Sequence, residues 1–397
     1  MRKNFRRPPP VGGKPEPLKI PARARAILDP LSRQAHAAGL PLFLVGGCVR
    51  DWLLGRAAVS DLDLCVVGDP SPLAKSCARR LGGRAEAFGR FGTLRVIAPS
   101  GVRVDFAQAR RETYPSPACL PEVSPAGGIE EDLIRRDFTA NALALRLSPG
   151  PRELIDPMGG LADIKRGILR FLHPESFRDD PTRVFRAARY LARFGFAPAR
   201  EMAPAARRAL EAGYAARLSP HRVLQELLRI LEEKEPAPAL RILRRWGYLE
   251  LLHPRLAAPR DFALDGAAER LALLALRLGP EEALAWIDSL PIERAAAALI
   301  REALVRAREK AASRAPLSDF SRRVLKAAYP GLASAALKPL FLSGGDLSAR
   351  GVAPGRLMGE VLNRASRLQW RGSLSSRHDA LAWLDGPGLY AKISRSS

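Results

Sequence analysis

The pattern of hydrophobic residues changes near residue 160, and this change limits the folds available to the 397-residue chain. Before it come short apolar runs typical of strands, at 42–45, 62–67, and in a hairpin of 94–99 and 102–109 around a Ser-Gly turn. After it, Ala, Leu, Arg and Glu dominate and the strand signals vanish. We therefore expect an α+β region followed by an all-α remainder. Further expected elements are helices at 24–38, 49–54 and 71–81 and a second hairpin from 142–147 and 153–157.

The charge balance favours a polyanionic partner. The chain has 64 Lys and Arg against 41 Asp and Glu, a net charge of +23, which ranks nucleic acid ahead of an anionic membrane. An arginine-rich composition without a function is the alternative. Residues 1–23 are basic and Pro-rich and are expected to be a poorly ordered extension without the apolar stretch of a secretory signal.

Two further features lead us to expect a cytoplasmic protein. No apolar run approaches the ~18 residues that a membrane span requires. The four cysteines lack a CxxC spacing, so we expect neither a zinc site nor disulfides, but small core residues in a reducing compartment. They are Cys48, Cys65, Cys77 and Cys119.

Two acidic residues stand in the second expected strand. Asp61 and Asp63 share one face because they are two residues apart, while Leu62 and Leu64 point to the core. Two carboxylates this close repel each other, and Mg²⁺ would remove the repulsion. Asp105, in 102–109, is a candidate third carboxylate for phosphoryl transfer with two metals. The alternative is an Asp-x-Asp that caps a turn.

A glycine pair precedes these acids. Gly46 and Gly47 lie between the first strand and the helix that starts near Val49, where backbone N–H groups can approach a phosphate. Arg50, in the first turn, can bind a phosphate oxygen. A Gly-Gly pair alone is usually only a turn.

A basic helix is expected within 178–196, with Asp179 or Asp180 as its N-cap and Pro181 in its first turn. Its spacing places four arginines on one face, opposite Val184, Ala188, Leu191 and Ala192. These arginines are Arg183, Arg186, Arg189 and Arg193. A solvated basic face is the alternative reading.

Asp180 and Arg183 together match the hydrogen-bonding pattern on the Watson–Crick edge of cytosine and of adenine. Asp only accepts hydrogen bonds and Arg only donates them. Cytosine and adenine both present an amino donor beside a ring-nitrogen acceptor, whereas uracil and guanine present a carbonyl beside a ring N–H. The pair would therefore select CTP and ATP.

The chain resembles the class II tRNA nucleotidyltransferase and bacterial poly(A) polymerase family. The resemblance lies in an ordered series of segments over residues 42–196. These segments are LVGGCVRDWLLGR…SDLDL, VDFAQARRETY, EEDLIRRDFTANALAL, LIDPMGGLADIKRGILR and SFRDDPTRVFRAARYLARFGF, with weaker matches at 217–231 and 339–362.

The resemblance implies a nucleotidyltransferase head with a mixed β-sheet at 24–160. It implies a helical neck for base recognition at 161–235, and a helical body and tail that bind tRNA at 236–397. The reaction would add C and A to the tRNA 3′ end, beyond the acceptor stem, from CTP and ATP without a template, releasing pyrophosphate.

The resemblance also implies residue roles. Asp61 and Asp63 would bind catalytic Mg²⁺, with Asp105 as third carboxylate, and Gly46, Gly47 and Arg50 would hold the triphosphate. Arg136 would contact the nucleotide, with Asp137 and Asn141 toward the ribose, unless these two only fix a turn. Asp180, Arg183, Arg186 and Arg189 would recognise the base and contact phosphates.

Three alternatives remain open. A poly(A) polymerase shares the head, but its relatives often carry a more basic segment than FGRFGTLRV at 88–96. A CC-adding or A-adding enzyme would differ around residues 84–93. A non-catalytic RNA-binding protein is disfavoured by the intact set of aspartates.

Overall fold

The computed structural model describes residues 18–89 and 92–386, and the chain forms two compact units, Met1–Leu218 and Ser219–Ser397. The extension predicted to be poorly ordered falls mostly outside the described residues. The first unit contains, in chain order, α1 (Ala22–Ala37), β1 (Leu42–Val45), α2 (Gly47–Leu53), β2 (Asp61–Val66), α3 (Ser71–Leu81), β3 (Arg84–Phe88), β4 (Thr93–Ile97), β5 (Arg103–Gln108), β6 (Arg110–Thr113), β7 (Glu122–Pro125), α4 (Ile129–Ile134), the 3₁₀ helix η1 (Thr139–Asn141), β8 (Ala144–Ser148), β9 (Leu154–Ile155), α5 (Gly160–Arg166), β10 (Ile168–Leu169), α6 (Ser176–Asp179), α7 (Thr182–Phe194), β11 (Ala197–Pro198), α8 (Met202–Glu211) and the 3₁₀ helix η2 (Ala215–Arg217).

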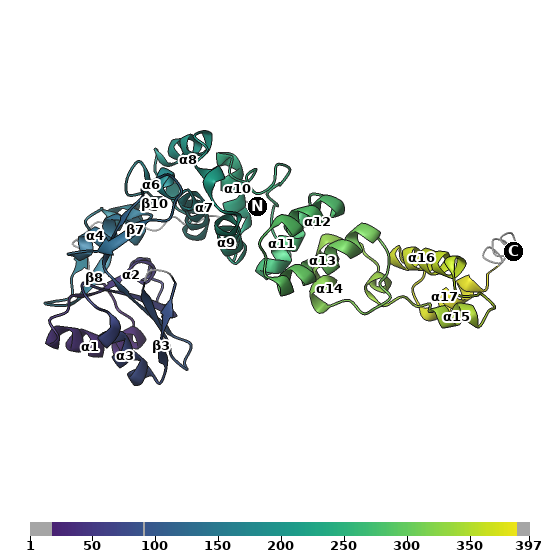
Figure 1. Ribbon diagram of the computed structural model, residues 1–397, viewed down its shortest axis with the longest axis horizontal. Helices are drawn as coiled ribbons and strands as arrows, with labels where there is room; N and C mark the ends of the chain where they lie inside the picture. The colour runs from purple at the N-terminus through teal and green to yellow at the C-terminus, as the bar shows by residue number, and fades with distance from the viewer. Residues whose placement is uncertain (1–17, 90–91, 387–397) are drawn as a thin grey trace. The chain divides into compact units, whose positions relative to one another are not determined.

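A seven-stranded mixed sheet forms the centre of the first unit (Figure 1). Its strand order is β3-β4-β5-β2-β1-β8-β9. Strands β2 and β5 are parallel, and the other neighbours are antiparallel. The predicted α+β class with a mixed sheet is confirmed.

The two faces of this sheet have different coverings. Leu62, Leu64, Val104 and Phe106 are buried on one face, against which α1 and α3 pack. The other face carries a second hydrophobic cluster that includes residues of α4. Burial of the face that carries Leu62 and Leu64 stabilises the strands. Because side chains alternate along a strand, Asp61 and Asp63 point to the opposite face.

The structure departs from the predicted elements in three places. The prediction of no strands beyond residue 160 is wrong, because β10 and β11 pair in parallel over two residues each. Strands this short show no alternation in a sequence. The sequence patterns also missed β3 and the hairpin of β6 and β7, whose residues are largely exposed.

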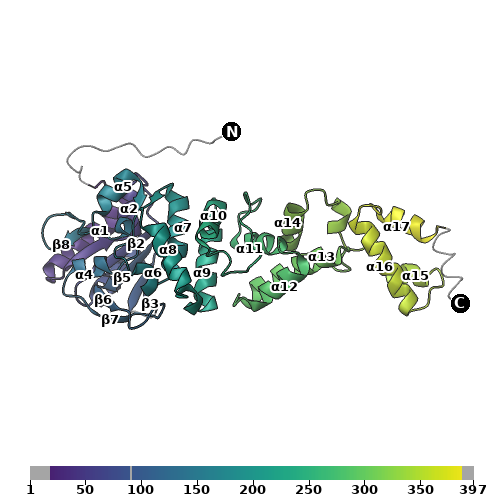
Figure 2. The ribbon, with the colours of Figure 1, turned by 90° about the horizontal axis from the view of Figure 1, so that it is seen from above.

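The described part of the second unit contains helices and no strands (Figure 2). Ser219 caps the first helix by accepting a hydrogen bond from the Arg222 N–H. The helices are α9 (Pro220–Leu231), α10 (Ala237–Trp246), α11 (Ala267–Leu276), α12 (Pro280–Ser289), α13 (Arg294–Glu309), α14 (Asp319–Ala328), the 3₁₀ helix η3 (Ser334–Leu337), α15 (Gly344–Ser348), α16 (Arg356–Trp370) and α17 (Arg377–Leu384). Helix α11 contacts α12, α13 and α14, and α15 to α17 enclose a separate hydrophobic cluster.

Candidate active site

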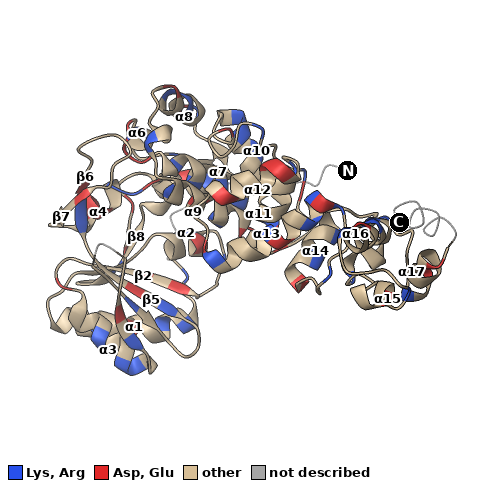
Figure 3. Cartoon of the chain, turned by 45° about the vertical axis from the view of Figure 1, so that its right-hand side comes forward, with Lys and Arg blue, Asp and Glu red and all other residues tan. Residues whose placement is uncertain are grey.

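The predicted carboxylates lie on two adjacent parallel strands. Asp63 of β2 is directly opposite Asp105 of β5, and Asp61 lies two residues earlier on the same face. Leu62 and Leu64, each 1% exposed, point into the core, as the alternation predicts. Figure 3 shows acidic and basic residues side by side on β2 and β5.

Arginines neutralise two of these carboxylates. Arg95 of β4 donates from Nε and Nη2 to the two oxygens of Asp105, at 2.8 and 2.7 Å. Arg103 Nε lies 2.5 Å from Asp61 Oδ1. Within the described ranges, no three His, Cys, Asp or Glu side chains are grouped as a metal site. In this conformation, therefore, arginines and not one another are the partners of the outer carboxylates.

Asp63 is held differently from its neighbours. Burial raises the pKa of Asp63, and the negative charges of Asp105 and Asp61 add to this effect, while Arg136 opposes it. Repulsion among three carboxylates is what a divalent cation relieves, and carboxylate oxygens are suitable hard ligands for such a cation. The chemistry of these donors therefore suits a divalent metal, whereas their arrangement in this conformation, with arginines on Asp105 and Asp61, does not group all three around one site.

The glycine pair borders the same place. Gly46 has φ +74°, and a Cβ there would lie 3.0 Å from Arg136 Nη1 and 3.7 Å from Asp63 Oδ2. A Cβ on Gly47 would lie 3.5 Å from Arg50 Nη2. The structure thus brings the turn, Asp63 and two of the predicted arginines together.

Arg50 starts a buried polar chain. Its Nη1 donates to the Asn141 side-chain oxygen, and its guanidinium carbon lies 4.5 Å from the Phe194 ring centroid. Asn141 donates to Asp137 Oδ1 at 2.8 Å. Arg186 of α7 then donates to Asp137 Oδ2 from Nε and Nη2, at 2.9 and 2.6 Å. This series of hydrogen bonds connects α2, η1 and α7.

Arg186 also determines the ionisation of Asp137. Burial alone would favour the neutral acid, but Arg186 and the Asn141 hydrogen bond lower the pKa of Asp137 to about 2. The carboxylate is therefore charged at neutral pH and holds Arg186 in place.

The predicted base-recognition residues have protein partners in this conformation. Asp180 accepts from the Thr182 N–H at 3.0 Å, next to the start of α7, but the N-cap of this helix is Pro181 and not Asp179 or Asp180. Arg183 is 5% exposed and donates to Ser176 Oγ and to the Arg135 carbonyl. Arg189 is 8% exposed.

The alternative reading of α7 as a solvated basic face is therefore wrong for Arg183 and Arg189. Helical spacing sorts residues onto faces, but it does not show that an arginine face meets carbonyl and hydroxyl acceptors from earlier parts of the chain.

Several residues of the site were missed by sequence reasoning. Asp132 is 1% exposed and accepts hydrogen bonds from both Arg135 and Arg136. Arg95 and Arg103 were missed as well, because the carboxylates that they meet lie on neighbouring strands. The register with Asp105 and Asp61 would have been the only signal for them.

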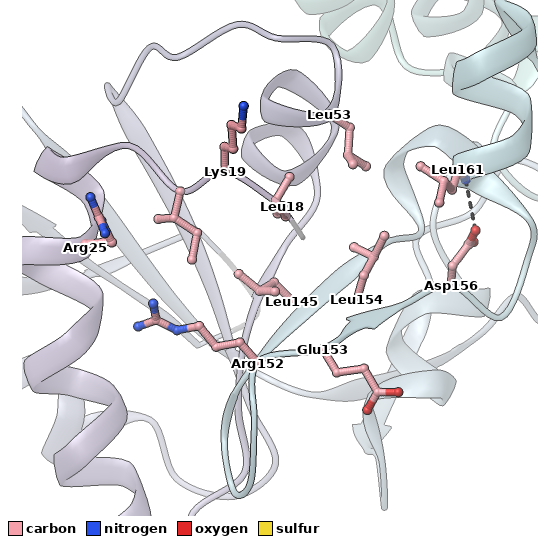
Figure 4. Close-up of a pocket in the computed structure, with 11 residues that line it drawn as sticks. Leu18, Lys19, Arg25, Leu53, Leu145, Arg152, Glu153, Leu154, Asp156 and Leu161 are labelled. Atoms are coloured by element: carbon pink, nitrogen blue, oxygen red, sulfur yellow. Dashed lines mark hydrogen bonds between the residues drawn. The ribbon is translucent and has the colours of Figure 1, made fainter. Parts of the chain in front are cut away.

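A separate cavity in the first unit contains none of the predicted site residues (Figure 4). It has a volume of about 890 Å³, with Leu18, Leu53, Leu145 and Leu154 among its apolar lining. At its edge, Asp156 accepts hydrogen bonds from the backbone N–H groups that start α5. The carboxylate of Asp156 thus serves the local turn, while Arg152 and Glu153 of the lining form ion pairs with Asp29 and Arg146.

Comparisons with known proteins match this architecture. Residues 42–170 match the poly A polymerase head domain, and residues 195–258 match a probable RNA and SrmB-binding site of polymerase A. The chain is 37% identical over 358 residues to a CC-adding tRNA nucleotidyltransferase of Deinococcus radiodurans, covering 89% of this chain and 90% of that protein.

A shorter match is with an A-adding tRNA nucleotidyltransferase of Geobacter sulfurreducens, 40% identical over 60% of this chain and 27% of that protein. The chain spans from about a quarter to about half of the length of the three A-adding relatives that it matches.

A solved structure has the same fold. A CCA-adding enzyme in complex with CTP superposes with a TM-score of 0.65 and 26% identity, covering 92% of this chain and 95% of that one. No helix in the described part of the chain is long and apolar enough to span a membrane. The sheet, the paired strand aspartates and the match along nearly all of a relative's length lead to one conclusion: the chain belongs to the class II tRNA nucleotidyltransferase and bacterial poly(A) polymerase family.

Proposed function

We propose that this protein adds C and A to the 3′ end of tRNA from CTP and ATP and releases pyrophosphate. The observation that carries the proposal is the parallel register of β2 and β5, which places Asp63 opposite Asp105 beside the Gly46 turn and Arg136. Carboxylates next to a cationic cradle are the parts that phosphoryl transfer requires.

Asp61 and Asp63, with Asp105, are the proposed ligands of Mg²⁺. Their oxygens suit this hard cation, and Arg95 and Arg103 would have to release Asp105 and Asp61 for all three to take part. A bound metal would lower the pKa of the attacking 3′-hydroxyl and stabilise charge on the triphosphate.

The chain's own residues orient the nucleotide. Gly46 and Gly47 allow close approach to the triphosphate, and Arg136 and Arg50, whose Nη atoms border the turn, would bind its oxygens. Asp137 and Asn141 stay proposed neighbours of the ribose, and both already belong to one hydrogen-bonded chain.

Base selection is proposed for α7. Asp180 and Arg183 stand at its start, and Arg186 and Arg189 follow on the helix. The donor and acceptor pattern of Asp180 with Arg183 matches cytosine and adenine. Asp180→Ala should therefore weaken discrimination against UTP and GTP in incorporation assays, and unchanged discrimination would contradict this role.

CC addition is a second candidate. The relative that matches over 89% of this chain is named a CC-adding enzyme, whereas the A-adding relatives match over 53–60% of it. The segment expected to differ, 84–93, includes residues 90–91, which lie outside the described residues.

The proposed setting is the cytoplasm, with the helical second unit binding tRNA. The free cysteines fit a reducing compartment. The net charge of +23 suits a polyanionic partner.

Asp63→Ala and Asp61→Ala test the catalytic assignment. Each should lower nucleotide incorporation by at least about a thousandfold, because charge stabilisation in phosphoryl transfer is lost, while tRNA affinity stays within about twofold. Incorporation of labelled CTP and tRNA binding by fluorescence anisotropy are the two measurements.

Asp29→Ala is the control, because it also removes an acid paired with an arginine, Arg152, but outside the proposed site. Loss of tRNA binding together with loss of activity would instead assign Asp61 and Asp63 a role in folding.

A further inference from the structure

Asp132 of α4 is a buried carboxylate outside the proposed catalytic set. Its residue is 1% exposed. An ionised carboxylate is costly at such a site unless it is paired and hydrogen-bonded. Its partners therefore indicate what the carboxylate is for.

The two oxygens of Asp132 serve two different arginines. Oδ2 accepts from Arg136 Nε at 3.2 Å and Nη2 at 2.7 Å. Oδ1 accepts from Arg135 Nε at 3.0 Å and Nη2 at 2.6 Å, and from the Arg110 backbone N–H at 3.3 Å. These contacts anchor the carboxylate on β6 and on the end of its own helix.

The contact with Arg136 fixes one edge of its guanidinium. The group is planar, so a carboxylate that engages Nε and Nη2 also sets the direction of the remaining nitrogen, Nη1. Nη1 lies 3.0 Å from the position of a Cβ on Gly46, and Asp63 Oδ2 lies 3.7 Å from that same position. The guanidinium of Arg136 is thus held on one edge by Asp132, and its other edge faces the turn at Gly46.

We propose that Asp132 is a positioning residue that directs the guanidinium of Arg136 toward the triphosphate of the incoming nucleotide. The inference rests on the proposed function. Asp132 itself does not reach the nucleotide. Without it, Arg136 gains rotational freedom, and the ordering of its side chain must then occur on nucleotide binding.

A double-mutant cycle tests the proposal. Asp132→Asn keeps the shape of the side chain and removes its charge, Arg136→Gln removes the guanidinium, and the third variant combines them. Affinity for CTP and ATP is measured by calorimetry without tRNA. Asp132→Asn should weaken binding about tenfold, as expected for a charge-assisted hydrogen bond, and the double variant should bind no more weakly than Arg136→Gln.

Kinetics separate positioning from a general structural effect. Asp132→Asn should raise KM for CTP and ATP, while the affinity for tRNA stays that of the wild type. Glu153→Gln is the matched control in the same unit, because it also removes an acid bonded to an arginine, Arg146, at 2.6 Å. It should bind both nucleotides as the wild type does.

Asp132→Glu covers the case in which Asp132→Asn fails to fold. It keeps the charge but displaces the contact with Arg136, so it should fold and still weaken nucleotide binding. Unchanged affinity in a folded Asp132 variant, or losses that multiply in the double variant, would overturn the positioning role alone. A wild-type protein that binds neither CTP nor ATP would overturn the proposed function and this inference with it.

Discussion

Three acids of the first unit, the buried Asp132 and Asp137 and the half-buried Asp63, differ in what neutralises them. Asp132 is held by Arg135 and Arg136, and these arginines lower its pKa although burial opposes the charged form. Asp137 is held by Arg186 in the same manner. Arg136, whose charge acts on Asp63, is bonded to Asp132 instead, and burial raises the pKa of Asp63. Asp132 and Asp137 are thus structural anions that arginines neutralise, whereas a bound cation would stabilise the charged form of Asp63.

Asp137 should make the first unit sensitive to acid. Its pKa of about 2 in the folded state lies below the ordinary value of 3.8, so its stabilising effect is complete above about pH 5 and is lost as pH falls toward 2. Asp137→Asn should therefore lower the free energy of unfolding by about 2 kcal/mol at pH 7. That difference from the wild type should shrink between about pH 4 and pH 2.

Urea unfolding of both proteins over a pH series measures this difference. Asp29→Asn, which removes an exposed acid, should follow the wild type at every pH. A gap between Asp137→Asn and wild type that stays constant down to pH 2 would show that Asp137 does not carry the effect.

Among the elements of the first unit, the turn between β1 and α2 combines a positive φ with close packing. Gly46 has φ +74°, a conformation that side chains disfavour, and its missing Cβ leaves room for Arg136 Nη1. Gly55, just after α2, has φ +75°, and no atom lies within 4 Å of the position that a Cβ would occupy there. The two glycines therefore separate strain from crowding.

Gly46→Ala should lower stability by about 1–2 kcal/mol through strain and should also displace Arg136, so that affinity for CTP falls. Gly55→Ala should show the same loss of stability with unchanged affinity for CTP. Thermal unfolding and calorimetry of both variants check the two effects. Equal losses of affinity would mean that Arg136 does not depend on the space beside Gly46.

Local patterns predicted the elements that position the site better than the contacts within it. The alternation of Asp61, Leu62 and Asp63 predicted one shared face, and the structure confirms it. The same patterns put the arginines of α7 on one face but could not show that Arg183 is buried, because its acceptor, the Arg135 carbonyl, comes from a distant part of the sequence. Asp132 was missed for the same reason, since its role depends on tertiary packing around a short helix.

At the scale of the whole molecule, the main property that composition determines is the net positive charge. The net charge of +23 belongs to a chain whose second described unit is helical and carries many arginines. The family match extends through residues of both units. The switch near residue 160 predicted a sheet-containing part followed by a helical part, whereas the two compact units divide after Leu218, a boundary that depends on long-range contacts.

Binding of tRNA should depend strongly on salt. Contacts to several phosphates release counterions, so the affinity for tRNA should fall by about tenfold or more between about 50 and about 200 mM salt. CTP carries one triphosphate, so its affinity should fall less over the same range. Fluorescence anisotropy measures the salt dependence of tRNA affinity, and calorimetry measures that of CTP affinity. Binding of tRNA that is insensitive to salt would argue against an electrostatic interface.

Sequencing of tRNA 3′ ends tests the proposed addition of C and A most directly. The protein is incubated with Mg²⁺, CTP and ATP and with tRNAs that lack A, CA or CCA, and Asp63→Ala serves as the inactive control. We expect all three tRNAs to be completed to CCA and addition then to stop. Products that end at CC would select the second candidate, and a poly(A) tail or unchanged 3′ ends would contradict the proposed function.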